Sequence, residues 1–201
     1  MNIISIILVT IGCLIGLLLL IAIFSKKEYT VIREIEIANT KCNVFDYIRY
    51  LKNQDNYSKW VMMDPSMKKQ FKGKDGTVGF VYGWDGNKKA GAGEQEIKSI
   101  TEGKRIEMEI RFTRPIKGVV QTSMETRSIS SINSTQEKTS VKWIFSSRFA
   151  YPINMMLLFM DMDKLLGKDL ELSLNNLRSA LEIKDNKYEY HQGLGADRST
   201  I

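Results

Sequence analysis

The chain has 201 residues, of which 43% are hydrophobic and 26% charged, and its formal net charge is +6. This length suits a single domain with a core of its own. The basic residues are scattered and many alternate with glutamates, as they do over residues 105–111. A nucleic-acid binder gathers its basic residues on one face beside exposed aromatic residues, so nucleic acid is not an expected partner.

The two cysteines cannot form a disulfide within the folded domain. Cys13 lies inside a long apolar segment, and Cys42 lies in the more polar part of the chain. The absence of a disulfide framework fits a reducing compartment.

Residues 3–24 form an apolar segment without any charged side chain. A helix over this segment would extend for about 33 Å, enough to cross the hydrocarbon core of a bilayer. A secretion signal would have basic residues before a shorter apolar run and small residues at a cleavage site, whereas this segment ends in Ile23 and Phe24. We therefore expect residues 1–27 to be a transmembrane anchor. Lys26 and Lys27 follow the segment and no basic residue precedes it, which predicts a cytoplasmic domain on a single-pass membrane protein.

The next part of the chain predicts a strand followed by short helices. Residues 29–38 alternate between apolar and polar side chains, which indicates a strand. Asn39 and Thr40 offer capping oxygens for a helix over 41–51. Residues 55–62 indicate a second short helix or a turn that ends before Pro65. In the strand predicted over residues 29–38, one side is expected to carry Tyr29, Val31, Arg33, Ile35 and Ile37.

After Pro65 the apolar pattern changes to a period of two, which predicts a series of strands. The turn at residues 85–87 has an Asp-Gly-Asn sequence that suits a tight reversal. Strands joined by such short turns favour an antiparallel meander. The expected strands cover residues 77–84, 94–100, 105–112, 118–130 and 139–149.

The last predicted element is a long helix that opens at Pro152, because proline suits a first helical turn. Leucines recur at helical spacing from Leu158 to Leu181, and this stripe is expected to pack across the concave face of the sheet. Residues 184–201 lose this periodicity and are expected to form a flexible C-terminal tail.

Several local motifs together resemble the START-like (SRPBCC) superfamily, and within it the polyketide cyclase/dehydrase-type proteins of bacteria. They are Trp60 with Asp64-Pro65, the Trp84-Asp85-Gly86-Asn87 turn, Gly91-x-Gly93-Glu94 and the Thr139-x-Val141-x-Trp143 strand. The resemblance covers residues 29–183 and implies an α+β helix-grip fold for the domain at residues 28–183. In that fold a curved antiparallel β-sheet wraps a long C-terminal helix, with a deep apolar cavity between them. Here one transmembrane helix would precede it.

The side-chain inventory excludes several kinds of chemistry. The only histidine is His191 in the expected tail, so a Ser-His-Asp triad or a Cys-His pair inside the domain is excluded. No His/Cys cluster has zinc spacing, and no glycine-rich motif has phosphate-binding spacing. We therefore expect no catalytic residue, no metal and no cofactor.

The candidate site residues are mostly aromatic. Tyr82, Trp84, Met108, Trp143 and Phe145 share one phase of their strands, and Phe159 belongs to the expected helix. Such side chains suit a plastic apolar ligand site, although for any one of them packing in the core is the more usual role. Glu94 is the candidate carboxylate: inside an apolar cavity its pKa would rise, while on the outer face it would be an ordinary solvated charge.

These features lead to three functional hypotheses. The first is membrane-tethered binding of a hydrophobic small molecule or lipid in the cavity, with the bilayer as a further partner through residues 3–24. The second is an enzyme resembling a polyketide cyclase or aromatase, which would need polar groups converging in the cavity. The third is an interaction or stress-response module without a ligand. Fold alone does not choose among them.

Overall fold

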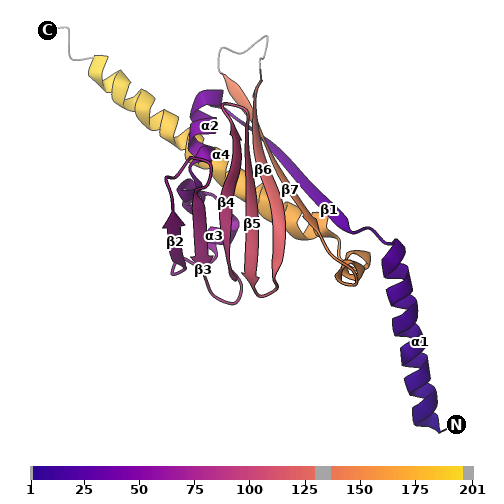
Figure 1. The fold of residues 1–201 in the computed structure, drawn as a ribbon. Coiled ribbons are helices and arrows are strands. Elements are labelled where there is room, and N and C mark those ends of the chain that lie inside the picture. Colours follow the sequence, from indigo (N-terminus) through magenta and orange to yellow (C-terminus); the bar gives the residue numbers. More distant parts are fainter. Residues whose placement is uncertain (1, 130–136, 197–201) are drawn as a thin grey trace.

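The computed structural model describes residues 2–129 and 137–196, with side chains up to residue 182. It shows an α+β protein in which an isolated helix, α1 (Ile3–Phe24), precedes an antiparallel sheet and a long final helix, α4 (Met162–Ala196) (Figure 1). The α+β class predicted from the sequence is confirmed.

The sheet has seven strands, all paired antiparallel to their neighbours. The last six strands of the chain follow one another as a meander. The first strand of the chain pairs with the last strand and forms one edge of the sheet. In spatial order the strands are β1 (Glu28–Ile37), β7 (Lys138–Arg148), β6 (Gly118–Ile129), β5 (Arg105–Arg114), β4 (Ala92–Thr101), β3 (Val81–Asp85) and β2 (Lys68–Lys72).

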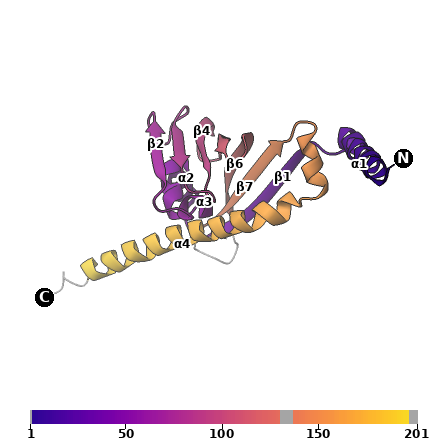
Figure 2. The same ribbon diagram turned by 90° about the horizontal axis from the view of Figure 1, so that it is seen from below.

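Three short helices connect β1 to β2 at the opposite edge: α2 (Lys41–Arg49), the 3-10 helix η1 (Leu51–Asn56) and α3 (Lys59–Met62). They lie on the same side of the sheet as α4 (Figure 2). As predicted, Thr40 caps α2, because its hydroxyl oxygen accepts a hydrogen bond from the Asn43 amide at 3.3 Å.

The hydrophobic core lies between this face of the sheet and the helices. The predicted leucine stripe is confirmed from Leu170 to Leu181, where Leu170, Leu174 and Leu177 of α4 are buried, but Leu158 and Leu165 are exposed. The buried leucines belong to the same buried cluster as strand residues such as Ile106 and Met108. Burying side chains of this size stabilises a fold by roughly 1.5–3 kcal/mol each, so this layer is the main support of the cavity described below.

Arg33 of β1 also points toward α4. Its guanidinium donates hydrogen bonds to Asp163 at 2.8 Å and 2.9 Å and to Glu171 at 2.6 Å. Gly167 lies one helical turn from each of these acidic residues, and a Cβ atom there would stand 1.9 Å from Arg33 Nη2. The glycine therefore makes room for the guanidinium on the packed face of the helix.

The predicted strands need two corrections: β2 was not predicted, and the start of β3 was predicted too early. β2 has a single apolar residue, Phe71, among lysines and a glutamine, because it is an edge strand and edge strands commonly carry lysine. β3 begins at Val81 instead of Thr77, since Gly76 and Gly79 turn the backbone with positive φ. Val78 consequently lies in the preceding turn and is exposed.

The C-terminal helical region is divided, whereas one continuous helix was expected. Pro152 precedes a 3-10 helix, η2 (Ile153–Leu158). The helix α4 is a separate helix that begins after Asp161, and the Asp161 carboxylate caps it by accepting a hydrogen bond from the Lys164 amide at 3.1 Å. The helix then continues to Ala196, beyond the end expected near residue 182. The flexibility expected of residues 184–201 stays a prediction.

The helix α1 is long and apolar enough to cross a membrane, and a signal sequence near an N-terminus meets the same criteria. Most of its side chains are exposed. Its C-terminal end packs against η2, where Ala22 is fully buried. The helix therefore projects from one end of the domain (Figure 1).

Candidate functional site

A cavity of about 280 Å³ lies between the sheet, α3 and α4. Apolar atoms make up most of its wall, and its buried lining residues come from β3, β4, β5 and β7 and from the segments that precede β2. Its aromatic lining residues are Trp60, Tyr82, Trp84, Phe112, Trp143 and Phe145. All three tryptophans of the chain therefore line one cavity.

The aromatic rings form two groups. Trp60 of α3 stands edge-on to Trp143, with ring centroids 6.1 Å apart, and packs at 5.7 Å from Phe145. Trp84 stands edge-on to Phe112 at 5.7 Å. Such contacts stabilise by about 0.5–1.5 kcal/mol beyond simple burial, which helps to hold the rings in place.

Both strand tryptophans have their polar group satisfied by the protein. The indole N–H of Trp143 donates to the Thr122 hydroxyl at 2.9 Å, and that of Trp84 donates to the Ala90 carbonyl at 3.2 Å. These two rings can therefore offer apolar surface to a ligand without leaving a buried donor unpaired.

Three polar residues are buried in the cavity wall: Gln54, Ser58 and Gln95. The amide of Gln95 donates to the Met108 sulfur at 3.0 Å. The Gln54 side chain is 5% exposed, and its Nε2 has no hydrogen-bond partner among the described residues. An unpaired buried amide costs roughly 1–3 kcal/mol, and the protein atoms around this nitrogen enclose it almost completely.

The mouth of the cavity lies at two hairpin turns. Lys89 belongs to the β3–β4 turn, and Arg114 and Pro115 begin the β5–β6 turn. Lys89, Arg114 and Pro115 are exposed, whereas the polar lining residues Gln54, Ser58 and Gln95 are buried. The positive charges of the lining are thus at the entrance, and the interior is neutral.

Gly93 explains how a tryptophan fits at this entrance. It pairs with Trp84 across the β3–β4 ladder, and a Cβ atom at Gly93 would stand 2.8 Å from the indole ring. A side chain at this position would therefore displace Trp84 from the cavity wall.

The β3–β4 turn is fastened by Asp64, which precedes β2. The Asp64 carboxylate accepts hydrogen bonds from the Asn87 amide at 2.7 Å and from the Ser66 hydroxyl at 2.7 Å. The bond from Ser66, followed by that from Asn87, lowers the pKa of Asp64. A Cβ atom at Gly86 would come within 3.1 Å of Asp64 Oδ2. Two motifs that are distant in sequence therefore form one structure at the mouth.

The wall formed by η1 and α3 is attached to α4. The Lys59 amide donates to the buried Ser173 hydroxyl at 3.0 Å, and the Asn176 side chain donates to the Tyr57 carbonyl at 3.3 Å. The Lys59 ammonium also pairs with Asp169. These contacts fix the position of Trp60 over the cavity.

The structure brings four of the seven predicted site residues together, since Tyr82, Trp84, Trp143 and Phe145 line the cavity. Met108 faces the same side of the sheet, but it is buried against Gln95 and is not part of the lining.

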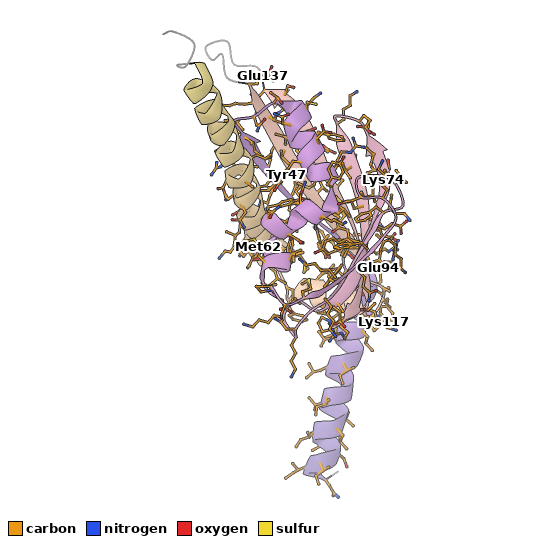
Figure 3. The ribbon with its side chains drawn as sticks, turned by 90° about the vertical axis from the view of Figure 1, so that its left-hand side faces the viewer. Tyr47, Met62, Lys74, Glu94, Lys117 and Glu137 are labelled. Atoms are coloured by element: carbon orange, nitrogen blue, oxygen red, sulfur yellow. The ribbon has the colours of Figure 1, made fainter. Side chains whose placement is uncertain are left out.

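The other two predicted residues lie elsewhere. Phe159 follows η2 and is 73% exposed, because the break before α4 turns it away from the sheet. Glu94 lies on the outer face, because its neighbour Gln95 points inward and successive strand residues face opposite sides. Figure 3 labels Glu94 on the β4 side of the domain.

On that outer face Glu94 belongs to an ion-pair cluster around Arg111. The guanidinium contacts Glu94 and Glu96 at 2.8 Å each and Glu109 at 2.5 Å. The hydrogen bond from Arg111 is the main reason that the pKa of Glu96 is lowered. Glu94 therefore has Arg111 as a structural partner and does not line the cavity. The hypothesis that it is a cavity carboxylate with a raised pKa is withdrawn.

Some lining residues could have been found from the sequence. Ile110 and Phe112 share the phase of Met108 in a strand that alternates regularly, and they do line the cavity. Gln54 could not have been found from the sequence, because it lies in a polar segment without an apolar pattern. The 3-10 conformation of this segment buries Gln54. Over residues 2–129 and 137–182, no group of three His, Cys, Asp or Glu side chains is placed to hold a metal ion.

Comparisons with known proteins define the fold only. No protein-family profile and no curated protein sequence matches this chain. A solved structure from Nitrosospira multiformis has 16% identity and a TM-score of 0.52 over 76% of this chain and 96% of its own. XoxI from Bacillus cereus has 11% identity and a TM-score of 0.52, over 78% and 96% of the two chains.

The Aha1 dimer from Colwellia psychrerythraea gives a similar result, with 13% identity and a TM-score of 0.51 over 77% and 97% of the two chains. These proteins share the antiparallel-sheet fold of this domain. None of the three has an equivalent of the whole chain, since about a quarter of this chain lies outside each match.

Proposed function

We propose that this protein is a membrane-tethered binding protein for a small hydrophobic molecule or lipid, built on a START-like helix-grip domain. One observation carries the proposal: an apolar cavity of about 280 Å³ lies in the core, and all three tryptophans of the chain line it. A core that served packing alone would gain stability by filling this space with apolar side chains.

The volume and lining of the cavity limit the ligand. At about 280 Å³ it is slightly smaller than the roughly 300–1,000 Å³ typical of small-molecule sites. It therefore suits a compact apolar molecule or one end of an acyl or isoprenoid chain.

The role of α1 in this proposal is to hold the domain at a bilayer. Apolar ligands partition into lipid, and a tether raises the effective concentration of the domain near them. The lysines after α1 give the orientation, with the domain in the cytoplasm.

The structure offers little support for the enzyme alternative. The Tyr82 hydroxyl donates to Asp55 at 2.8 Å, and burial, followed by this hydrogen bond, raises the pKa of Tyr82. The phenol therefore keeps its proton at neutral pH and is already engaged as a donor. The binding proposal needs no such group.

The fluorescence of the protein provides a direct test, because its three tryptophans line the cavity. We would titrate the full chain in lipid nanodiscs with a bromine-substituted long-chain alcohol, whose heavy atom quenches nearby indoles. Saturable quenching at one alcohol per protein is expected. Quenching that only rises linearly with the alcohol would contradict the proposal.

A matched pair of variants tests where the alcohol binds. Leu166 lines the cavity from α4, and Leu172 lies on the exposed side of the same helix. Leu166→Phe is expected to weaken the saturable quenching, and Leu172→Phe is expected to leave it unchanged. Equal effects would place the alcohol outside the cavity.

A further inference from the structure

The connection between β7 and α4 exposes an unusual amount of apolar surface. Residues 150–160, here called the η2 loop, contain no charged side chain. Clusters of exposed apolar side chains on a soluble surface mark contact with another apolar phase. The large apolar side chains that the loop exposes are Tyr151, Ile153, Met156, Leu158, Phe159 and Met160.

The η2 loop is attached to the end of α1. Asn154 is fully buried and donates a hydrogen bond to the Ala22 carbonyl at 2.6 Å, so it satisfies one of the last carbonyls of α1. Figure 1 shows η2 beside the C-terminal end of α1. If α1 spans a bilayer, this end lies where the hydrocarbon meets the headgroups, and the loop lies at the same level.

The same end of the domain carries a second exposed apolar tip. Ile116, in the β5–β6 turn, is 64% exposed and is followed by Lys117. In Figure 1 the β3–β4 and β5–β6 turns point in the direction in which α1 extends. Figure 3 agrees, since Lys117 lies near α1 while Lys74 and Glu137 lie toward the other end.

Basic side chains surround these apolar tips. Lys26 and Lys27 follow α1, and Lys88 and Lys89 lie in the β3–β4 turn. A surface with apolar tips among lysines is complementary to a bilayer that contains anionic headgroups. The two turns also form the mouth of the cavity.

We propose that the η2 loop and the β5–β6 turn insert into the interfacial layer of the bilayer that α1 spans, so that the cavity mouth opens onto lipid. This inference rests on the transmembrane role proposed for α1, and it adds the surface through which a ligand would enter. The occupant of the apolar surface is the lipid of the same membrane, because the contact of η2 with α1 makes the loop continuous with the anchor.

The test uses the full chain in vesicles of phosphatidylcholine and phosphatidylglycerol. In a background with Cys13→Ala and Cys42→Ser, spin labels are attached to single cysteines at Ile153→Cys, Phe159→Cys and Ile116→Cys. Power saturation then compares collisions with oxygen, which concentrates in lipid, and with a water-soluble nickel complex. The control is Val78→Cys, an exposed apolar position near Lys74 in the chain.

The labels at the η2 loop and the β5–β6 turn are expected to collide more with oxygen than with nickel, and the label at Val78→Cys is expected to do the reverse. Nickel collisions at Phe159→Cys equal to those at Val78→Cys would overturn the inference. Shielding of the η2 labels from both reagents would also overturn it, since that pattern means burial against protein, such as a second copy.

The result is separable from the other proposals. Resistance of the protein to extraction by alkaline buffer measures the anchoring by α1, and the label depth measures the η2 loop. A protein that stays in the vesicles but has aqueous labels contradicts this inference alone. Neither readout depends on a ligand in the cavity, and the tryptophan fluorescence of each variant verifies that the domain is folded.

Discussion

Arg33 and Gly167 show how two residues that break local rules can satisfy each other. A cation on the core-facing side of β1 and a glycine within α4 are each unfavourable alone. Together they let the guanidinium reach Asp163 and Glu171 across the helix surface. The sequence predicts that Arg33 shares one side of its strand with apolar residues, but only the structure identifies its partners, because they are more than a hundred residues away.

We expect Gly167→Ala to destabilise the domain, although alanine normally favours a helix by about 1 kcal/mol over glycine. The added Cβ displaces the guanidinium and weakens its ion pairs with two half-exposed carboxylates, each contributing up to about 1 kcal/mol, and with the steric clash a net loss of up to about 1 kcal/mol is expected. Thermal unfolding followed by tryptophan fluorescence would measure it.

The control for this prediction is the same substitution in an Arg33→Met background. There the alanine should be neutral or stabilising, because no guanidinium occupies the space. A stabilising effect of Gly167→Ala in the wild-type chain would contradict the account of this contact.

Acid stability is predicted from the same contact. The hydrogen bond from Arg33 lowers the pKa of Asp163 below its ordinary value of 3.8. The stabilisation is therefore fully present above that value and is lost as the pH falls through the lower pKa of the folded protein. The difference in melting temperature between the wild type and Asp163→Asn should shrink as the medium becomes more acidic than pH 3.8. A constant difference down to pH 2 would contradict this assignment.

At the level of elements, the sequence was most informative where apolar residues repeat regularly. β5 and β7 alternate, and α4 carries a buried leucine stripe from Leu170 to Leu181, so their existence and inward faces are predictable. β2 was missed because its edge position requires little apolar surface. The division between η2 and α4 was missed because the apolar residues on both sides obscured the capping role of Asp161.

The stripe of α4 gives a prediction with an internal control. Leu174 is fully buried, and Leu172 is about half exposed on the same helix. Leu174→Ala should destabilise the domain by about 2–5 kcal/mol, since it leaves a cavity in the packed layer. Leu172→Ala should cost less than about 1 kcal/mol, a contrast that denaturant unfolding would reveal. Similar losses for both would mean that α4 packs with a different face.

For the whole molecule, the arrangement of anchor, cavity mouth and η2 loop could not be predicted from the sequence. Local patterns identify α1 and the strands, but the pairing of β1 with β7 brings the start of the domain beside its last connection. That long-range pairing places Asn154 against the end of α1. The cavity residue Gln54 depends in the same way on tertiary structure.

Membrane orientation can be tested with the natural cysteine of the domain. Cys42 lies in α2 and is exposed. With the domain in the cytoplasm, a thiol reagent that cannot enter cells should label Cys42 only after the cells are opened, in a variant that lacks Cys13. Labelling in intact cells would show that the domain faces outward.

The central claim is that the cavity holds a hydrophobic ligand, and mass spectrometry of the purified full chain tests it most directly. The protein would be released from nanodiscs of defined synthetic lipid, and the small molecules bound to it would be extracted and weighed. One compound in stoichiometric amount is predicted in the wild type and in Leu172→Trp, and its loss is predicted in Leu166→Trp, which fills the cavity. A wild-type protein without any adduct, or equal amounts in both variants, would contradict the claim.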